Sequence, residues 1–108
     1  MIGGATHGFD IDTSVNGEVG TIDVHGELDV RTAPRLITAV RDVAKTTAVR
    51  HIAVRTDGID FVDSAGIRAL IVSRNEATSL GIDLGIATAS PAVHRVLDVT
   101  GLTALLRP

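Results

Sequence analysis

The chain has 108 residues, the size of one ordinary domain, with 44% hydrophobic residues, only 2% aromatic residues, no cysteine and a net charge of -3. This composition argues against nucleic-acid binding through base stacking or a basic surface, and it excludes thiol catalysis and cysteine-ligated metal. No apolar run approaches the length of a membrane span and the first residues do not resemble a secretion signal, so we expect a soluble cytoplasmic protein.

The first part of the chain predicts a tail followed by a β-hairpin. Residues 1–8 are small, glycine-rich and without periodicity, so we expect a flexible N-terminal tail ahead of one domain over residues 9–108. Apolar and polar residues alternate over residues 9–15 and again over about 19–25, which is typical of half-buried strands. Between them stands Asn16-Gly17, a strong signal for a tight hairpin turn.

The middle of the chain predicts a helix and a third strand. Residues 26–29 (Gly-Glu-Leu-Asp) indicate a break, and Thr32-Ala33-Pro34 is typical of a helix start, where proline is tolerated in the first turn. Apolar residues at helical spacing then continue to Ala44. Residues 51–56 read as a short strand and residues 57–60 as a loop.

The last part of the chain continues the alternation of helices and strands. We expect a second helix over residues 64–80, a strand over 82–88, and a third helix that begins at Ser90-Pro91 and ends at Gly101. Residues 102–107 are apolar and consistent with a final strand. Strands alternating with helices predict an α/β fold: a small mixed β-sheet with an antiparallel entry hairpin, otherwise mainly parallel, flanked by helices.

One motif, Phe-Val-Asp-Ser-Ala-Gly-Ile at residues 61–67, carries most of the functional information. It places the hydroxyl of Ser64 at a helix N-terminus, beside Asp63 and small neighbours. Such a serine is either a helix cap or a reachable functional hydroxyl. Gly66 in the first helical turn costs about 1 kcal/mol relative to alanine. Either a partner's backbone approaches this glycine closely, or it packs tightly inside the domain.

Signatures of catalysis and metal binding are not found in the sequence. There is no glycine-rich phosphate loop, no His-Glu-x-x-His and no Gly-x-Ser-x-Gly, so we expect no enzymatic activity. The acidic residues Asp57, Asp60 and Asp63 lack the closing glutamate of a calcium loop. Their position ahead of a helix, where the dipole favours negative charge, explains them better than a metal site does.

Three segments together resemble the bacterial anti-sigma factor antagonists, which are STAS domains. They are residues 26–29, residues 61–67 and the pattern Ser-Pro-Ala-Val-x-Arg-x-x-Asp-x-x-Gly-Leu at residues 90–102, in the order and at the separations of the family. The resemblance implies a small mixed sheet flanked by helices, with Ser64 as the phosphoacceptor. It implies a serine kinase that is also an anti-sigma factor as the partner, and a serine phosphatase that restores the unphosphorylated form. It implies no cofactor and no catalysis by the domain itself.

The expected partner surface joins the start of the second helix to the loop at residues 29–32, since both follow strands at the same sheet edge. The expected contact residues are Asp29, Arg31, Thr32, Asp63, Ser64, Ala65, Gly66 and Arg68. Asp29 has no evident role in the core. Ala65 replaces a second hydroxyl of the family motif, and Arg68, one turn beyond Ser64, replaces a smaller residue. The alternatives are a STAS-like module that binds a nucleotide or lipid, in which Ser64 only caps, and an unrelated α/β enzyme.

Overall fold

Four strands form a single mixed sheet in the computed structural model, which describes residues 8–107. β1 (Phe9–Asn16) pairs with β2 (Val19–Leu28) in antiparallel orientation, while β3 (His51–Val62) and β4 (Asp83–Ala89) continue the sheet in parallel. The strand order is β1-β2-β3-β4. The predicted fold class, with its antiparallel entry hairpin, is confirmed. The predicted tail, apart from Gly8, lies outside the described residues.

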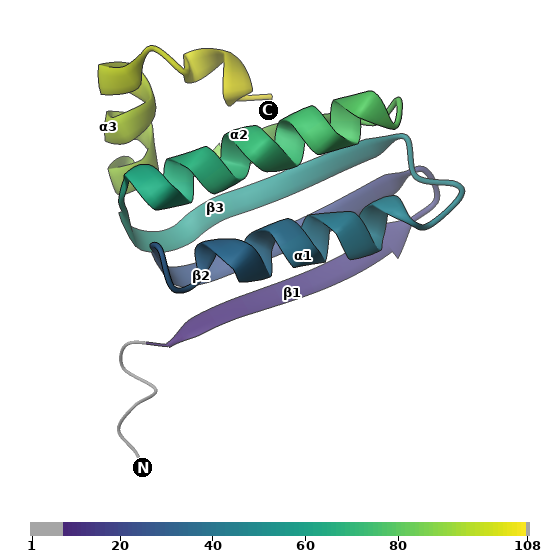
Figure 1. Ribbon diagram of the computed structural model, residues 1–108, viewed down its shortest axis with the longest axis horizontal. Coiled ribbons are helices and arrows are strands. Elements are labelled where there is room, and N and C mark those ends of the chain that lie inside the picture. The colour runs from purple at the N-terminus through teal and green to yellow at the C-terminus, as the bar shows by residue number, and fades with distance from the viewer. Residues whose placement is uncertain (1–7, 108) are drawn as a thin grey trace.

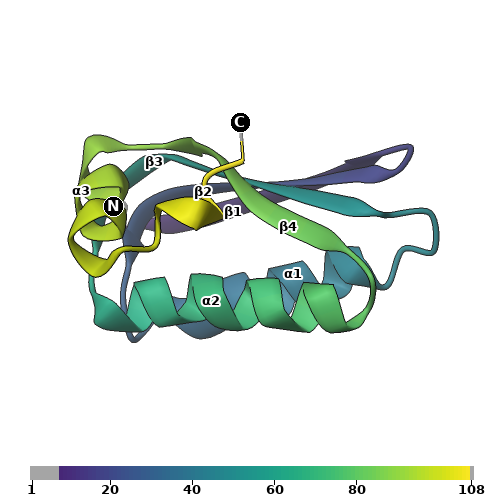
Figure 2. The ribbon, with the colours of Figure 1, turned by 90° about the horizontal axis from the view of Figure 1, so that it is seen from above.

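Two helices cover one face of this sheet and a third lies at one end. α1 (Ala33–Ala44) and α2 (Ser64–Ser79) run side by side across the sheet, and Figure 2 shows both on the same side of it. α3 (Pro91–Thr100) packs against β3 at the end of the sheet where α2 begins (Figures 1 and 2). The core between sheet and helices is aliphatic, and its fully buried members include Ile22, Val24, Leu36, Val40, Ile52, Val54, Leu70, Ile86 and Leu97.

The predicted break at residues 26–29 and the predicted loop at residues 57–60 are both wrong. β2 continues to Leu28 and β3 to Val62, and these two residues still pair with each other. Gly26, with φ of 102°, lies at one of two register shifts, so the strand bends there without losing its partner. Leu28 and Ile59 are buried, and their burial favours continued pairing over the local turn signals of the glycines.

The C-terminal segment forms a strand contact at a single point only. A short 3-10 helix, η2 (Thr103–Leu105), follows α3, and Leu106 then makes one parallel bridge with Ile86 of β4. The Arg107 amide donates a hydrogen bond to the Ile86 carbonyl at 2.8 Å. The apolar segment at residues 102–107 therefore docks Leu105 in the core and lies along the edge of β4 in place of a full strand. Across residues 8–107 no helix is long and apolar enough to cross a membrane.

Candidate functional site

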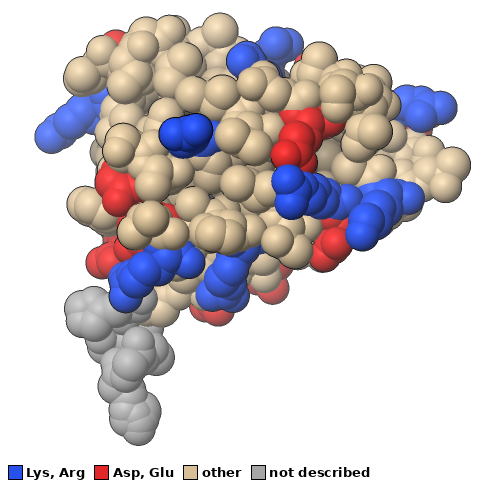
Figure 3. All heavy atoms as spheres, in the orientation of Figure 1, with Lys and Arg blue, Asp and Glu red and all other residues tan. Residues whose placement is uncertain are grey.

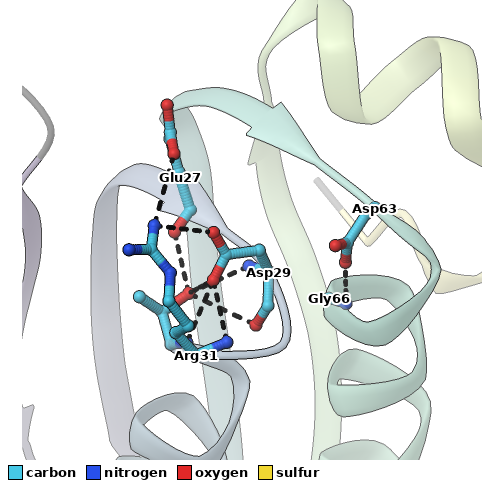
Figure 4. Close-up of polar contacts among 6 residues, drawn as sticks. Glu27, Asp29, Arg31, Asp63 and Gly66 are labelled. Atoms are coloured by element: carbon cyan, nitrogen blue, oxygen red, sulfur yellow. Dashed lines mark hydrogen bonds and ion pairs between the residues drawn. The ribbon is translucent and has the colours of Figure 1, made fainter.

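The candidate site lies at the carboxyl ends of β2 and β3, where two loops lead into the helices that cover the sheet. Leu28 and Val62 are paired at the ends of these strands, and the Asp63 amide donates to the Leu28 carbonyl at 3.3 Å. The segment at residues 29–32 and the first turn of α2 are therefore neighbours, as Figure 4 shows. The predicted juxtaposition of the two junctions is confirmed, because adjacent parallel strands bring their carboxyl ends to one edge.

The cap of α2 is Asp63 rather than Ser64. Asp63 has extended backbone geometry, and its carboxylate accepts a hydrogen bond from the Gly66 amide at 3.0 Å. Ser64 is the first helical residue, its side chain is exposed, and its hydroxyl forms no hydrogen bond with any residue in the described part of the chain. The interpretation of Ser64 as a helix cap is therefore wrong. A neighbouring carboxylate performs that role and leaves the hydroxyl accessible.

Gly66 is explained by packing inside the domain. The residue is buried, and a Cβ atom at this position would lie 2.5 Å from the Leu28 carbonyl oxygen and 2.9 Å from side-chain carbons of Leu28 and Val62. Only a glycine lets the first turn of α2 approach the end of β2 this closely. Of the two explanations that the sequence left open, tight packing holds. A contact between Gly66 and a partner stays a prediction.

Asp29 organises the loop between β2 and α1. Its carboxylate oxygen Oδ1 accepts hydrogen bonds from the amides of Arg31 at 2.9 Å and Thr32 at 3.2 Å, and the Thr32 hydroxyl in turn donates to the Glu27 carbonyl at 2.8 Å. The Asp29 residue is only 8% exposed. Asp29, for which the sequence indicates no role in the core, thus has a structural role in the loop, because local hydrogen bonds turn its side chain into it (Figure 4).

The charges in this loop are largely satisfied by one another. The Arg31 guanidinium lies 3.2 Å from the Asp29 carboxylate and 3.8 Å from that of Glu27, while its own side chain remains mostly exposed. Burial raises the pKa of the Asp29 carboxyl, but hydrogen bonds from Arg31 and Thr32 outweigh this effect and hold the pKa below its usual value. Asp29 is therefore charged at neutral pH and holds the loop together, and the Arg31 side chain that pairs with it stays exposed.

A surface groove between α1 and α2 includes Ala65, the residue after Ser64, in its lining, and the sequence did not predict it. The groove has a volume of about 360 Å³ and is lined mainly by apolar residues of the two helices and by Val30 from the preceding loop. Figure 3 views the face that carries these helices, where neutral residues are interspersed with acidic and basic side chains. Val30 is 70% exposed, and an apolar residue in an otherwise polar loop was the one sequence signal for this surface.

The remaining predicted site residues lie on the same surface. Ala65 and Arg68 both line the groove, and Arg68 is exposed one turn after Ser64. Phe61, 48% exposed, precedes the Asp63 cap and adds a second apolar side chain near the site. Among residues 8–107, no three histidine, aspartate or glutamate side chains are placed to hold a metal ion. The arrangement thus offers a reachable hydroxyl within an apolar surface flanked by charges.

Comparison with known proteins places the chain among relatives with one common architecture. The family model described as the STAS domain matches residues 10–108. An anti-sigma-B factor antagonist of Staphylococcus aureus is 26% identical over 98 residues, which cover 91% of this chain and 90% of that protein.

Two solved structures share the fold. An anti-sigma factor antagonist from Mycobacterium paratuberculosis superposes with a TM-score of 0.77 at 23% identity, covering 93% of this chain and 84% of the other. The unphosphorylated form of the anti-sigma factor antagonist SpoIIAA superposes with a TM-score of 0.75 at 22% identity, covering 93% and 86% respectively. At these identities the similarity establishes the arrangement of strands and helices.

Proposed function

The chain belongs to the STAS domain family, and from this premise we propose that it is an anti-sigma factor antagonist switched by phosphorylation of Ser64. In its unphosphorylated form it binds a serine-kinase anti-sigma factor and thereby releases the sigma factor. Phosphorylation by the same kinase ends the binding, and a serine phosphatase restores it. The domain acts in the cytoplasm as a substrate and binding module without catalysis of its own. Curated relatives that bear the name of antagonist support this proposal.

The observation that carries the proposal is that Asp63 caps α2, whereas the Ser64 hydroxyl stays accessible. A kinase must reach the acceptor hydroxyl without unfolding its substrate. Because Asp63 caps α2, the exposed Ser64 hydroxyl can be modified while the helix keeps its cap. The surroundings suit a contact surface, since exposed apolar side chains of Val30 and Phe61 belong to the two segments that meet there.

The electrostatics of the site predict that phosphorylation weakens partner binding and leaves the fold intact. A phosphate adds about -1.5 to -2 charges and three strong acceptor oxygens at neutral pH. At the first residue of α2 it meets the positive end of the helix dipole, so the fold tolerates it. Within a complex the same charges, next to Asp63, lie against a partner without compensation, which is costly. The domain therefore stays folded while the complex dissociates.

The experiment is phosphorylation of the purified chain by candidate anti-sigma factor kinases with ATP, followed by mapping of the modified residue by mass spectrometry. We expect one phosphate, on Ser64. Ser64→Ala is expected to remain unphosphorylated and to bind the kinase, whereas Ser64→Asp is expected to bind poorly. Phosphate on Thr32 or Ser73 with Ser64 unmodified would contradict the assignment. Failure of every kinase to bind or modify the wild-type chain would contradict the proposed function as a whole.

A further inference from the structure

The groove between α1 and α2 combines an apolar lining with an uneven distribution of charge. Its lining residues include the apolar side chains of Val30, Ala33, Ile37, Ala65, Ala69 and Val72. Two arginines, Arg41 and Arg68, also line it, and no acidic residue from the described part of the chain does. The groove is therefore an apolar surface with a basic border, although the chain as a whole is acidic.

The two arginines differ in whether they already form an ion pair. Arg41 forms a two-pronged pair with Glu76 across the helices, with nitrogen–oxygen distances of 2.7 and 2.8 Å. Arg68 has no ion pair and no side-chain hydrogen bond to any residue between 8 and 107. An arginine without a partner beside an apolar surface is suited to receive a carboxylate, which it binds through two parallel hydrogen bonds.

We propose that this groove receives a segment of the partner protein in which an apolar side chain stands next to an aspartate or glutamate, with Arg68 binding that carboxylate. The proposal rests on the proposed function, because the occupant is taken to belong to the anti-sigma factor that binds at Ser64. Charge complementarity selects an acidic segment. The groove lies open on the surface between two helices, which suits a side chain on a protein surface better than a small molecule that needs enclosure.

The position of the groove links its occupant to the switch. Val30 and Ala65 line the groove and also flank the Ser64 surface, so one partner can cover both. Ser64 and Arg68 are four residues apart on α2 and therefore lie on one face of the helix. A phosphate on Ser64 competes with the partner's carboxylate for Arg68 and repels that carboxylate. Arg68 thus binds the partner when Ser64 is unphosphorylated, and it binds the phosphate when Ser64 is phosphorylated.

The test measures affinity by isothermal titration calorimetry between the full chain and the anti-sigma factor kinase that phosphorylates it. Arg68→Gln is expected to weaken binding about tenfold or more, since a hydrogen-bonded charge is lost. The matched control is Arg95→Gln, an exposed arginine of α3 that changes net charge equally. Val30→Ser is expected to weaken binding about three- to tenfold through lost apolar burial, with Val99→Ser, 81% exposed on α3, as its control.

The outcomes separate this proposal from the one on which it rests. Equal effects of Arg68→Gln and Arg95→Gln, with tight binding of the wild type, would overturn the groove and leave the proposed function intact. Binding of laurate to the chain alone, lost in Arg68→Gln, would assign the groove to a fatty acid and overturn a protein occupant. A concentration-dependent dimer of the chain alone, lost in Val30→Ser, would assign it to a second copy. No binding and no phosphorylation of the wild type would remove both proposals.

Discussion

Asp63 and Gly66 are joined by a hydrogen bond of 3.0 Å from the glycine amide to the aspartate carboxylate, and this bond fixes the start of α2. It supplies one of the backbone partners that the first turn of a helix lacks. Ser64 lies between the two residues and takes no part in the bond. The capping function and the accessible hydroxyl are therefore separate features, which can be altered one at a time.

Asp63→Ala is expected to lower the free energy of unfolding by about 1 kcal/mol, the usual cost of losing a helix cap. Ser64→Ala, one residue away, is expected to change it by less than about 0.5 kcal/mol, since its exposed hydroxyl forms no hydrogen bond within residues 8–107. Urea denaturation of the two variants measures both values. A larger loss for Ser64→Ala than for Asp63→Ala would show that the serine caps the helix after all.

Gly66→Ala sets two effects against each other. Alanine gains about 1 kcal/mol of helix propensity over glycine. Its Cβ, however, meets the Leu28 carbonyl oxygen at 2.5 Å, and a backbone atom cannot move aside cheaply. Overpacking of this kind costs about 1–3 kcal/mol, so after the gain in helix propensity we expect a net destabilisation of up to about 2 kcal/mol. Thermal unfolding measures the difference, and a rise in Tm would show that α2 and β2 can separate without strain.

The pKa of Asp29 predicts a specific loss of stability in acid. Because the folded protein lowers this pKa below its ordinary value of 3.8, the contribution to stability is present above pH 3.8 and is lost as the pH falls through the lower folded value. Asp29→Asn is expected to be less stable than the wild type at pH 7 and to lose less stability between pH 5 and pH 2. Urea unfolding across this range tests the difference. Parallel pH profiles would assign the acid sensitivity to other carboxylates, such as Glu76 or Asp57.

Arg68 is expected to stabilise the phosphorylated form. Its guanidinium lies one turn beyond Ser64, and pairs at this spacing contribute about 0.3–0.5 kcal/mol, more when one member is a doubly charged phosphate. Arg68→Ala should therefore lower the Tm of the phosphorylated chain more than that of the unphosphorylated chain. Thermal melts of both forms, with Arg95→Ala as the control, measure the difference. Equal shifts in the two forms would leave Arg68 without a role in holding the phosphate.

The fold was predictable where the signals are local. Alternation of apolar and polar residues marked the hairpin, and capping residues such as Ser90, which accepts a hydrogen bond from the Val93 amide, marked the helices. The breaks predicted near Gly26 and Gly58 were wrong because the pairing of β2 with β3 and the burial of Leu28 and Ile59 oppose the local turn preference. Such pairing joins residues that are distant in sequence, so no local pattern reports it.

The site was predictable in its location but not in its details. Parallel strands bring their carboxyl ends together, so the loop at residues 29–32 and the start of α2 had to meet. The roles of Asp29 and Gly66 depend on atomic distances, to the Thr32 amide in one case and to the Leu28 carbonyl in the other. Neither distance can be inferred from the composition or from the spacing of residues in the sequence. The groove beside Arg68 depends likewise on how closely α1 and α2 pack.

The C-terminal segment beside β4 has a consequence for self-association. The free edge of a sheet is a template for pairing with another chain, and edge-to-edge growth leads to aggregates. Leu106 and Arg107 occupy part of the β4 edge through Ile86, while β1 at the opposite edge carries the exposed charges of Asp10 and Asp12. Both edges therefore disfavour strand addition by a second copy. Ser64, at the start of α2, lies at neither edge, so this protection of the edges does not cover its hydroxyl.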